Sequence, residues 1–223
     1  KLIVGLGVSL LQQTLFSPDK PKRKRQGITT KQTTSGDTTP QKFVVGRTGL
    51  EGHLIAPMYS TDGSGQEGLG TGGKANGRLT YILEVSNIPV KGLTGRIAID
   101  GEYTQIDNYN TNGQFSGLVD FADENKPDGF FAHIEFYDGT QTQAMSFLTD
   151  DIDLKNHPER PWTSDHILQG TAYAAVNFIF RREFFSGFPA VRFEVDGISL
   201  YDPRKDSTVG GSGTHRHDIP QTW

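Results

Sequence analysis

Short apolar segments of alternating polarity, separated by Asp-Gly pairs, constrain the fold of this chain more than any other sequence feature. The alternation is clearest in residues 130–137, where every second side chain from Phe130 to Phe136 would lie on one face of a strand. An Asp-Gly pair between two apolar segments is typical of a tight hairpin turn. These pairs lie at residues 100–101, 138–139 and 196–197.

The sequence therefore predicts a mainly β fold, built as a β-barrel or β-sandwich. Gly supplies 27 of the 223 residues, which suits many short strands and turns. Residues 2–16 alone have the pattern of a helix, and they are too short to span a bilayer, so no stable membrane insertion is expected. The segments predicted to be strands are residues 42–47, 79–85, 95–103, 130–137, 143–148, 171–180 and 191–200.

The charge is unevenly distributed along the chain. Seven basic residues and one acidic residue give residues 1–31 a net charge of +6, which leaves −10 for the rest of a chain whose total is −4. Such a basic arm indicates a partner of its own, either nucleic acid phosphates or an acidic protein surface. The residues predicted to contact that partner are Lys20, Lys22, Arg23, Lys24 and Arg25.

The predicted organisation has three parts. Residues 1–35 form an apolar segment followed by the basic, extended arm, and residues 91–159 form an inserted β-rich subdomain. A β-rich domain is assembled from residues 36–90 and 160–223, and the ends of the chain lead us to expect that this domain continues beyond residue 223. Residues 60–77 are predicted to be a long loop, and residues 150–168 a loop with one helical turn.

Two motifs resemble ligand-binding loops but lack a required residue. Residues 68–74 match most of a phosphate-binding loop, yet Ala75 stands where a magnesium-binding hydroxyl is needed, and the flanking segments are polar. Residues 108–119 resemble a calcium loop, but Val119 replaces the bidentate carboxylate. We interpret both as plain loops or turns.

The acidic and histidine residues show no spacing that fixes a catalytic or metal site. The carboxylates Asp150, Asp151 and Asp153 are interpreted as solvated surface, although two carboxylates at the right separation are all that a glycosidase requires. His133 is predicted to be packed within a strand. The remaining candidates, for acid–base chemistry or for a metal site, are Asp120, Asp123, Glu124, Asp128, His53, His215 and His217.

Cys is absent, which excludes disulfides and thiolate chemistry. Because the acidic and histidine residues also show no recognisable catalytic or metal-binding spacing, we expect no catalytic residue, no metal and no cofactor, and we expect the protein not to be an enzyme.

A specific resemblance is found near the end of the chain. Residues 188–207 contain Pro189, Phe193 and Gly197, followed by Tyr201-Asp202-Pro203-Arg204. This stretch resembles the P-x-x-x-F-x-V-x-G-x-x-x-Y-D-P-R element of the host-specificity J proteins of lambda-like phages, and of the tail-hub proteins of related prophages and gene transfer agents. Weaker similarities to the same family lie in residues 26–47, 81–90 and 170–180.

The resemblance implies a structural role. Proteins of this family form a homotrimeric hub that closes the tail tube at the distal end of the virion, next to the distal tail protein and the tape-measure protein. The host receptor would be met by a central fibre outside this chain, and DNA would only pass through. Under this interpretation the family motif residues are Tyr201, Asp202, Pro203 and Arg204.

Two other classes of function remain open. A β-sandwich carbohydrate-binding or adhesin module would show aromatic side chains on exposed loops, and Trp162 and Trp223 are the only tryptophans available for this. A hydrolase would need a catalytic arrangement that the sequence does not display.

Overall fold

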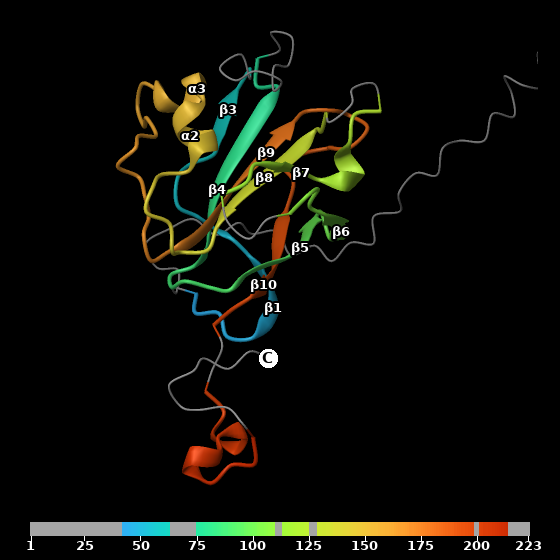
Figure 1. Ribbon diagram of the computed structural model, residues 1–223. Helices are drawn as coiled ribbons and strands as arrows, with labels where there is room; N and C mark the ends of the chain where they lie inside the picture. Colours follow the sequence, from blue (N-terminus) through green and yellow to red (C-terminus); the bar gives the residue numbers. More distant parts are fainter. Residues whose placement is uncertain (1–41, 63–74, 110–112, 125–128, 199–200, 214–223) are drawn as a thin grey trace, which may run out of the picture. The chain divides into compact units, whose positions relative to one another are not determined.

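The computed structural model describes residues 42–62, 75–109, 113–124, 129–198 and 201–213, and it confirms a mainly β fold of two antiparallel sheets (Figure 1). Sheet I contains β1 (Arg47–Glu51), β10 (Val191–Asp196), β5 (Gly92–Ile99) and β6 (Glu102–Gln105), in that order. Sheet II contains β2 (His53–Leu54), β4 (Arg78–Ser86), β9 (Ala172–Ile179), β8 (Ala132–Tyr137) and β7 (Ser116–Gly117), and β3 (Tyr59–Thr61) also pairs with β4.

The described helical elements are short. They are η1 (Val119–Phe121), α2 (Ser146–Asp150), α3 (Ile152–Lys155), η2 (Pro203–Lys205) and η3 (Ser207–Val209). Within the described residues no helix has the length and apolar character needed to cross a membrane.

The two sheets meet at a corner where only glycine fits. Gly52 is the single residue between β1, which pairs with β10 in sheet I, and β2, which pairs with β4 in sheet II. A Cβ atom at this buried position would lie 2.6 Å from the Cβ of Leu83 and 3.0 Å from a ring carbon of Phe193. The chain can therefore pass from one sheet to the other only because residue 52 has no side chain.

A second link joins the opposite edges of the sheets. Ile106 follows β6 and forms an antiparallel bridge with Leu118, which follows β7. The amide of Asp107 donates to the carbonyl of Gly117 at 2.9 Å. The strands consequently follow one another around the core from β1 through β10, β5, β6, β7, β8, β9 and β4 to β2.

The main core lies between the inner faces of the two sheets. Strand β10 shows the pattern, because Val191, Phe193 and Val195 are buried while Arg192 is exposed. The other large contributors from the two sheets are Tyr81, Leu83, Val85, Leu93, Ile97, Ile99, Ile134, Phe136, Val176 and Phe178.

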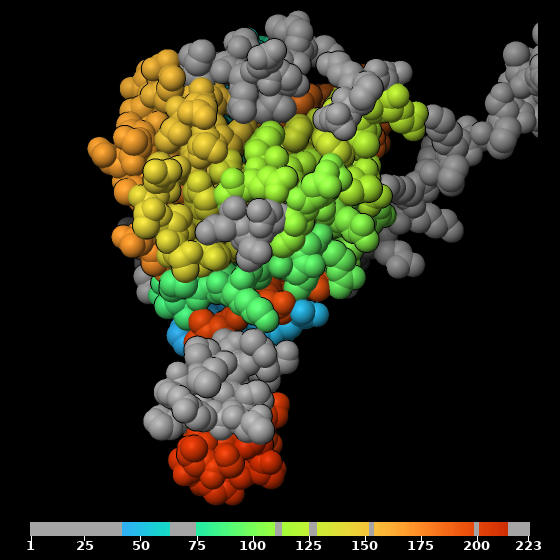
Figure 2. Space-filling model, in the orientation of Figure 1, coloured from blue at the N-terminus to red at the C-terminus, as the bar shows by residue number. Residues whose placement is uncertain are grey.

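A second core covers the outer face of sheet II. The connection between β8 and β9, residues 138–171, carries α2 and α3 across this face, and we call it the covering segment (Figure 1). In Figure 2 it is the yellow to orange part of the surface. Its buried side chains pack against Ile82, Tyr173 and Ala175 of the sheet, and they are Met145, Phe147, Leu148, Leu154 and Trp162. All eight residues of β9 are buried in consequence.

Of the three predicted hairpin turns the first is confirmed, whereas Asp138-Gly139 leads into the covering segment and no described strand follows Gly197. Asp100 and Gly101, with φ of 52° and 88°, form the two-residue turn of the β5–β6 hairpin, in which Ile99 pairs with Glu102. Gly139 has a φ of 102° in the second Asp-Gly turn. β10 ends at Asp196, immediately before Gly197, whose missing side chain leaves room for the carbonyl of Val44.

The covering segment departs from one prediction. Residues 143–148 were expected to be a strand, but α2 begins at Ser146. The adjacent side chains of Phe147 and Leu148 are both buried in the second core, which a short helix accommodates and an alternating strand on a one-sided surface does not. The helical turn predicted within residues 150–168 is confirmed by α3.

Residues 91–159, which the sequence led us to expect as an inserted subdomain, supply β5, β6, β7 and β8 to the same two sheets as their neighbours. Two of these strands pair with a strand that is distant in the sequence: β5 lies between β10 and β6, and β8 lies between β9 and β7. Strands β5 and β8 contribute to the same main core as β4, β9 and β10. The apolar segment, the predicted N-terminal helix and the basic arm lie outside the described residues.

Replacing the corner glycine tests the fold directly. We expect Gly52→Ala to lower the free energy of unfolding by about 1–3 kcal/mol, because the new methyl group must displace Leu83 in a packed core. Gly187→Ala is the matched control, since a Cβ there meets no atom within 4 Å. Urea unfolding followed by tryptophan fluorescence measures both, and equal midpoints for the two variants would contradict the corner argument.

Candidate functional site

The family motif residues form a capped turn. Asp202 precedes η2, and its carboxylate accepts a hydrogen bond from the amide of Arg204 at 3.0 Å. The same carboxylate accepts two bonds from the Arg204 guanidinium, each 2.9 Å long, and these bonds hold the pKa of Asp202 down at about 2. Pro203 occupies the first position of the turn, where its fixed φ suits the geometry and its missing N–H costs nothing.

Asp206 is the hydrogen-bonding centre of the same element, although the motif does not include it. Its buried carboxylate accepts from the hydroxyl of Tyr201 at 2.7 Å and from the amide of Thr208 at 2.8 Å. Donation to this carboxylate raises the pKa of Tyr201 to about 12. Residues 201–213 are thus stabilised by hydrogen bonds among themselves.

Two glycines close this element. A Cβ on Gly211 would lie 2.4 Å from the carbonyl oxygen of Pro203, and one on Gly213 would lie 2.2 Å from that of Lys205. The two glycines let the chain fold back against the turn that the motif begins. Its exposed surface carries Arg204 and the apolar side chains of Tyr201 and Val209, which are 40% and 58% exposed.

A buried ion pair lies beneath the covering segment. Arg78 of β4 donates a hydrogen bond to Asp151, and both side chains are fully buried. Asp151 was interpreted from the sequence as solvated surface, and that interpretation is wrong. Its carboxylate pairs with Arg78 and also caps α3 by accepting from the amide of Leu154 at 3.1 Å. Asp150 is exposed, in agreement with the prediction.

Further polar residues of β8 and β9 lie on this covered face. Glu135 accepts hydrogen bonds from the amide of Phe147 at 3.2 Å and from the hydroxyl of Ser146 at 3.4 Å, while its burial raises its pKa. The cross-strand partner of His133 is Asn177, which accepts a 3.2 Å bond from Thr80.

His133 is packed within its strand, as predicted. The ring of Phe115 stacks on it at a centroid distance of 4.8 Å and stacks on Phe147 at 4.4 Å. Burial and the nearby Arg78 lower the pKa of His133 to about 4, so the imidazole is neutral at pH 7.

Gln141 fixes the far end of the covering segment. Its side-chain amide donates to the carbonyls of Ile167, Leu168 and Thr171 at 2.7–3.2 Å, and its oxygen accepts from the amide of Gly139 at 2.9 Å. These bonds hold Leu168 at a φ of 53°, a conformation that a leucine rarely adopts. Gln141 thus joins the two ends of the covering segment, whereas Arg78 and Glu135 of the sheet hold its middle part through buried hydrogen bonds.

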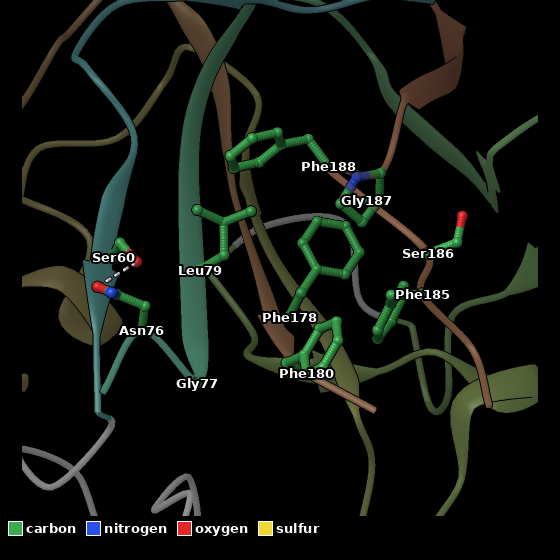
Figure 3. A pocket seen from close by; sticks show the side chains of 11 residues that line it. Ser60, Asn76, Gly77, Leu79, Phe178, Phe180, Phe185, Ser186, Gly187 and Phe188 are labelled. Atoms are coloured by element: carbon green, nitrogen blue, oxygen red, sulfur yellow. Dashed lines mark hydrogen bonds between the residues drawn. The ribbon is translucent and has the colours of Figure 1, made fainter. Parts of the chain in front are cut away.

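A pocket of about 390 Å³ lies where β3 and β4 meet the β9–β10 connection (Figure 3). Apolar side chains dominate its lining, and Phe188 and Phe180 are 75% and 47% exposed. On one side the hydroxyl of Ser60 donates to the amide oxygen of Asn76 at 3.1 Å. The remaining lining residues are Gly77, Leu79, Phe178, Phe185, Ser186, Gly187 and Pro189.

Several predicted candidates are not brought together. Asp120 and Glu124 are exposed near η1, and among the described residues no group of three His, Asp or Glu side chains could hold a metal ion. The candidates outside the described residues are Lys20, Lys22, Arg23, Lys24, Arg25, the loop 68–74, Asp128, His215 and His217.

The buried arginine and the aromatic pocket were missed from the sequence. Arg78 stands at the start of an apolar strand, where a charged residue would be expected to face solvent. The aromatic-rich run from Phe178 to Phe188 was the only sequence signal for the pocket.

The fold and these sites define a mainly β protein whose buried polar groups attach one segment to a sheet. No protein-family model matches the chain, and no curated protein matches it. A relationship to tail-hub proteins therefore stays a prediction from the sequence, which depends above all on the residues from Tyr201 to Arg204.

The effect of Arg204 on the pKa of Asp202 can be tested by titration. Asp202 should titrate with a midpoint near 2, and Arg204→Gln should bring the midpoint back toward the usual 3.8, because the hydrogen bonds that stabilise the carboxylate are lost. Since the pKa is depressed in the folded chain, the stabilisation is present above about pH 4 and is lost as the pH falls toward 2. Carboxyl-detected NMR measures the midpoint.

Lys205→Gln is the control for that titration. This variant removes one positive charge, as Arg204→Gln does. However, Lys205 acts on Asp202 only through space, and it is the weakest of the causes that lower the pKa of Asp202. If the two variants raised the midpoint equally, net charge and not the hydrogen-bonded contact would set the pKa of Asp202.

The buried ion pair makes a stability prediction. We expect Arg78→Met to lower the free energy of unfolding by about 3–5 kcal/mol, because Asp151 would be left as an unpaired buried charge. Adding Asp151→Asn should recover part of that loss, since both charges are then absent while the cap on α3 is retained. Urea unfolding measures both variants.

The exposed pair of Arg96 and Glu194 provides the comparison. The Arg96 side chain is 52% exposed, so Arg96→Met should lower the free energy of unfolding by less than about 1 kcal/mol.

The double variant Arg78→Met, Asp151→Asn should be more stable than Arg78→Met alone. If it were less stable, the interpretation of Arg78 and Asp151 as a buried ion pair would be contradicted.

Proposed function

We propose that this chain is a structural subunit of a phage tail tip, in which three copies form the hub that closes the tail tube and carries the central fibre for host recognition. The observation that carries the proposal is the element of residues 201–213, which begins with the family's Tyr-Asp-Pro-Arg sequence. The proposed location is the distal end of the tail, beside the distal tail protein and the tape-measure protein. The host receptor would contact regions outside this chain.

The geometry of the motif supports this proposal. Asp202 caps the turn, Pro203 begins it, Arg204 folds back onto Asp202, and Tyr201 donates to Asp206. Each of the four motif residues thus has a local structural function, and this is what a motif kept for architecture rather than for catalysis would require.

The construction of the sheets also fits a load-bearing role. A ring that closes a tube needs sheets that resist shear, and joined sheet edges supply this property. Here the sheets are linked at Gly52 and at the bridge between Ile106 and Leu118. Sheet II is further covered on its outer face by a segment that Arg78 and Glu135 hold in place.

The proposal predicts a trimer and a tail defect. Light scattering of the full chain should give three times its mass of 24.5 kDa. Deletion of the gene from the genome that encodes it should yield particles without closed tail tips in electron microscopy, and supplying the gene in trans should restore them. Normal, infectious tails from the deletion would overturn the proposal, whereas a monomer in solution with defective tails would confine the trimer to the assembled tip.

A further inference from the structure

We propose that the pocket between Ser60, Asn76 and the β9–β10 connection binds a neutral sugar ring of a glycan. The floor of the pocket is rigid, because Phe178 and Phe185 belong to the main core and their rings meet edge to face at 5.4 Å. A rigid floor lets a ligand bind without first ordering the site. Sugar binding at this pocket would be independent of the proposed function in a phage tail.

The exposed rings supply an apolar surface for the ligand. Phe188 is 75% exposed and Phe180 is 47% exposed, and both side chains line the pocket (Figure 3). Large apolar side chains grouped at a pocket, and left in contact with water, mark a binding site more often than scattered ones do. The ligand must therefore present an apolar face that can cover an aromatic ring.

The polar side chains supply hydrogen bonds at the edge of the same pocket. The Ser60 hydroxyl donates to the Asn76 amide oxygen at 3.1 Å, and this bond fixes the direction in which the amide faces. The Asn76 NH₂ group is then the donor that this residue can offer, and Ser186 provides a further hydroxyl. Asn76 has a φ of 56°, a backbone conformation that asparagine tolerates better than most residues do.

The absence of charge from the lining narrows the class of ligand. No Asp, Glu, Lys, Arg or His is among the described residues that line the pocket, so nothing there would pair with a phosphate, a carboxylate or a cation. A pyranose ring matches what remains, because its C–H face is apolar and its hydroxyl groups lie around the edge. The volume of about 390 Å³ lies at the small end of the range for ligand pockets, which suits a sugar ring rather than a long acyl chain.

The test uses the full chain and a panel of methyl glycosides and N-acetylhexosamines, with sialic acid as the charged probe. Saturation-transfer NMR should detect a neutral member of the panel, and calorimetry should then give its dissociation constant. Phe188→Ala should weaken binding by about tenfold or more, because an aromatic contact with the ring is lost. The side chain is mostly exposed, so this variant should unfold at the same urea concentration as the parent chain.

Two further variants separate recognition from general effects. Asn76→Asp keeps the shape and the permitted backbone conformation but replaces two donors by acceptors, so it should also weaken binding. Phe43→Ala removes another exposed phenylalanine, 63% exposed and absent from the pocket lining, and should leave binding unchanged.

Three outcomes would overturn the proposal. They are no binding by any neutral saccharide at millimolar concentration, binding that Phe188→Ala leaves intact, and stronger binding of sialic acid than of every neutral probe. Binding of an aromatic or aliphatic peptide that depends on Phe188, with no response to sugars, would likewise overturn it and would assign the pocket to a protein side chain.

Discussion

Strand β9 is buried along its whole length, and most other features of the structure follow from this constraint. Three of its eight residues are alanine, and these small side chains allow close packing on both faces. Its inner face adjoins the main core, and its outer face requires a cover. The covering segment is therefore an integral part of the fold.

The polar contacts of that cover are a consequence of the same burial. Arg78, Glu135 and Asn177 project to the covered face, where an unpaired charge or amide is costly. Asp151 accepts a hydrogen bond from Arg78, and the first residues of α2 donate to Glu135. These bonds also fix the position of the covering segment on the sheet. Moving the covering segment would leave Arg78 and Glu135 buried without their partners, and this cost favours one placement of the segment. The proposed hub would benefit from a single rigid arrangement.

Strands and turns that depend on a local sequence pattern could be predicted from the sequence. The strand at residues 130–137 and the turn at Asp100-Gly101 are set by alternation and by a residue pair, and both were found where expected. Contacts between distant residues left no such signal. Arg78 and Asp151 are 73 residues apart, and nothing near Asp151 distinguishes it from the exposed Asp150.

The same distinction applies to the candidate sites. The resemblance drew attention to Tyr201 through Arg204, but only the structure shows that Asp206, Gly211 and Gly213 complete the element. The pocket could not be predicted, because the exposure of Phe188 and Phe180 depends on how the β9–β10 connection lies against β3 and β4.

The pairing of β1 with β10 has a consequence for how the chain is made. Arg47 and Asp196 are hydrogen-bonded partners separated by 149 positions, so sheet I cannot close until almost all of the described chain has left the ribosome. At typical translation rates this interval is roughly 7–30 s. Once β10 has emerged, completion of sheet I should be slow, since non-local β pairing requires large loops to close. During that interval β4 lacks its neighbour β9 and β5 lacks its neighbour β10, so both strands have unpaired edges that could pair with another chain.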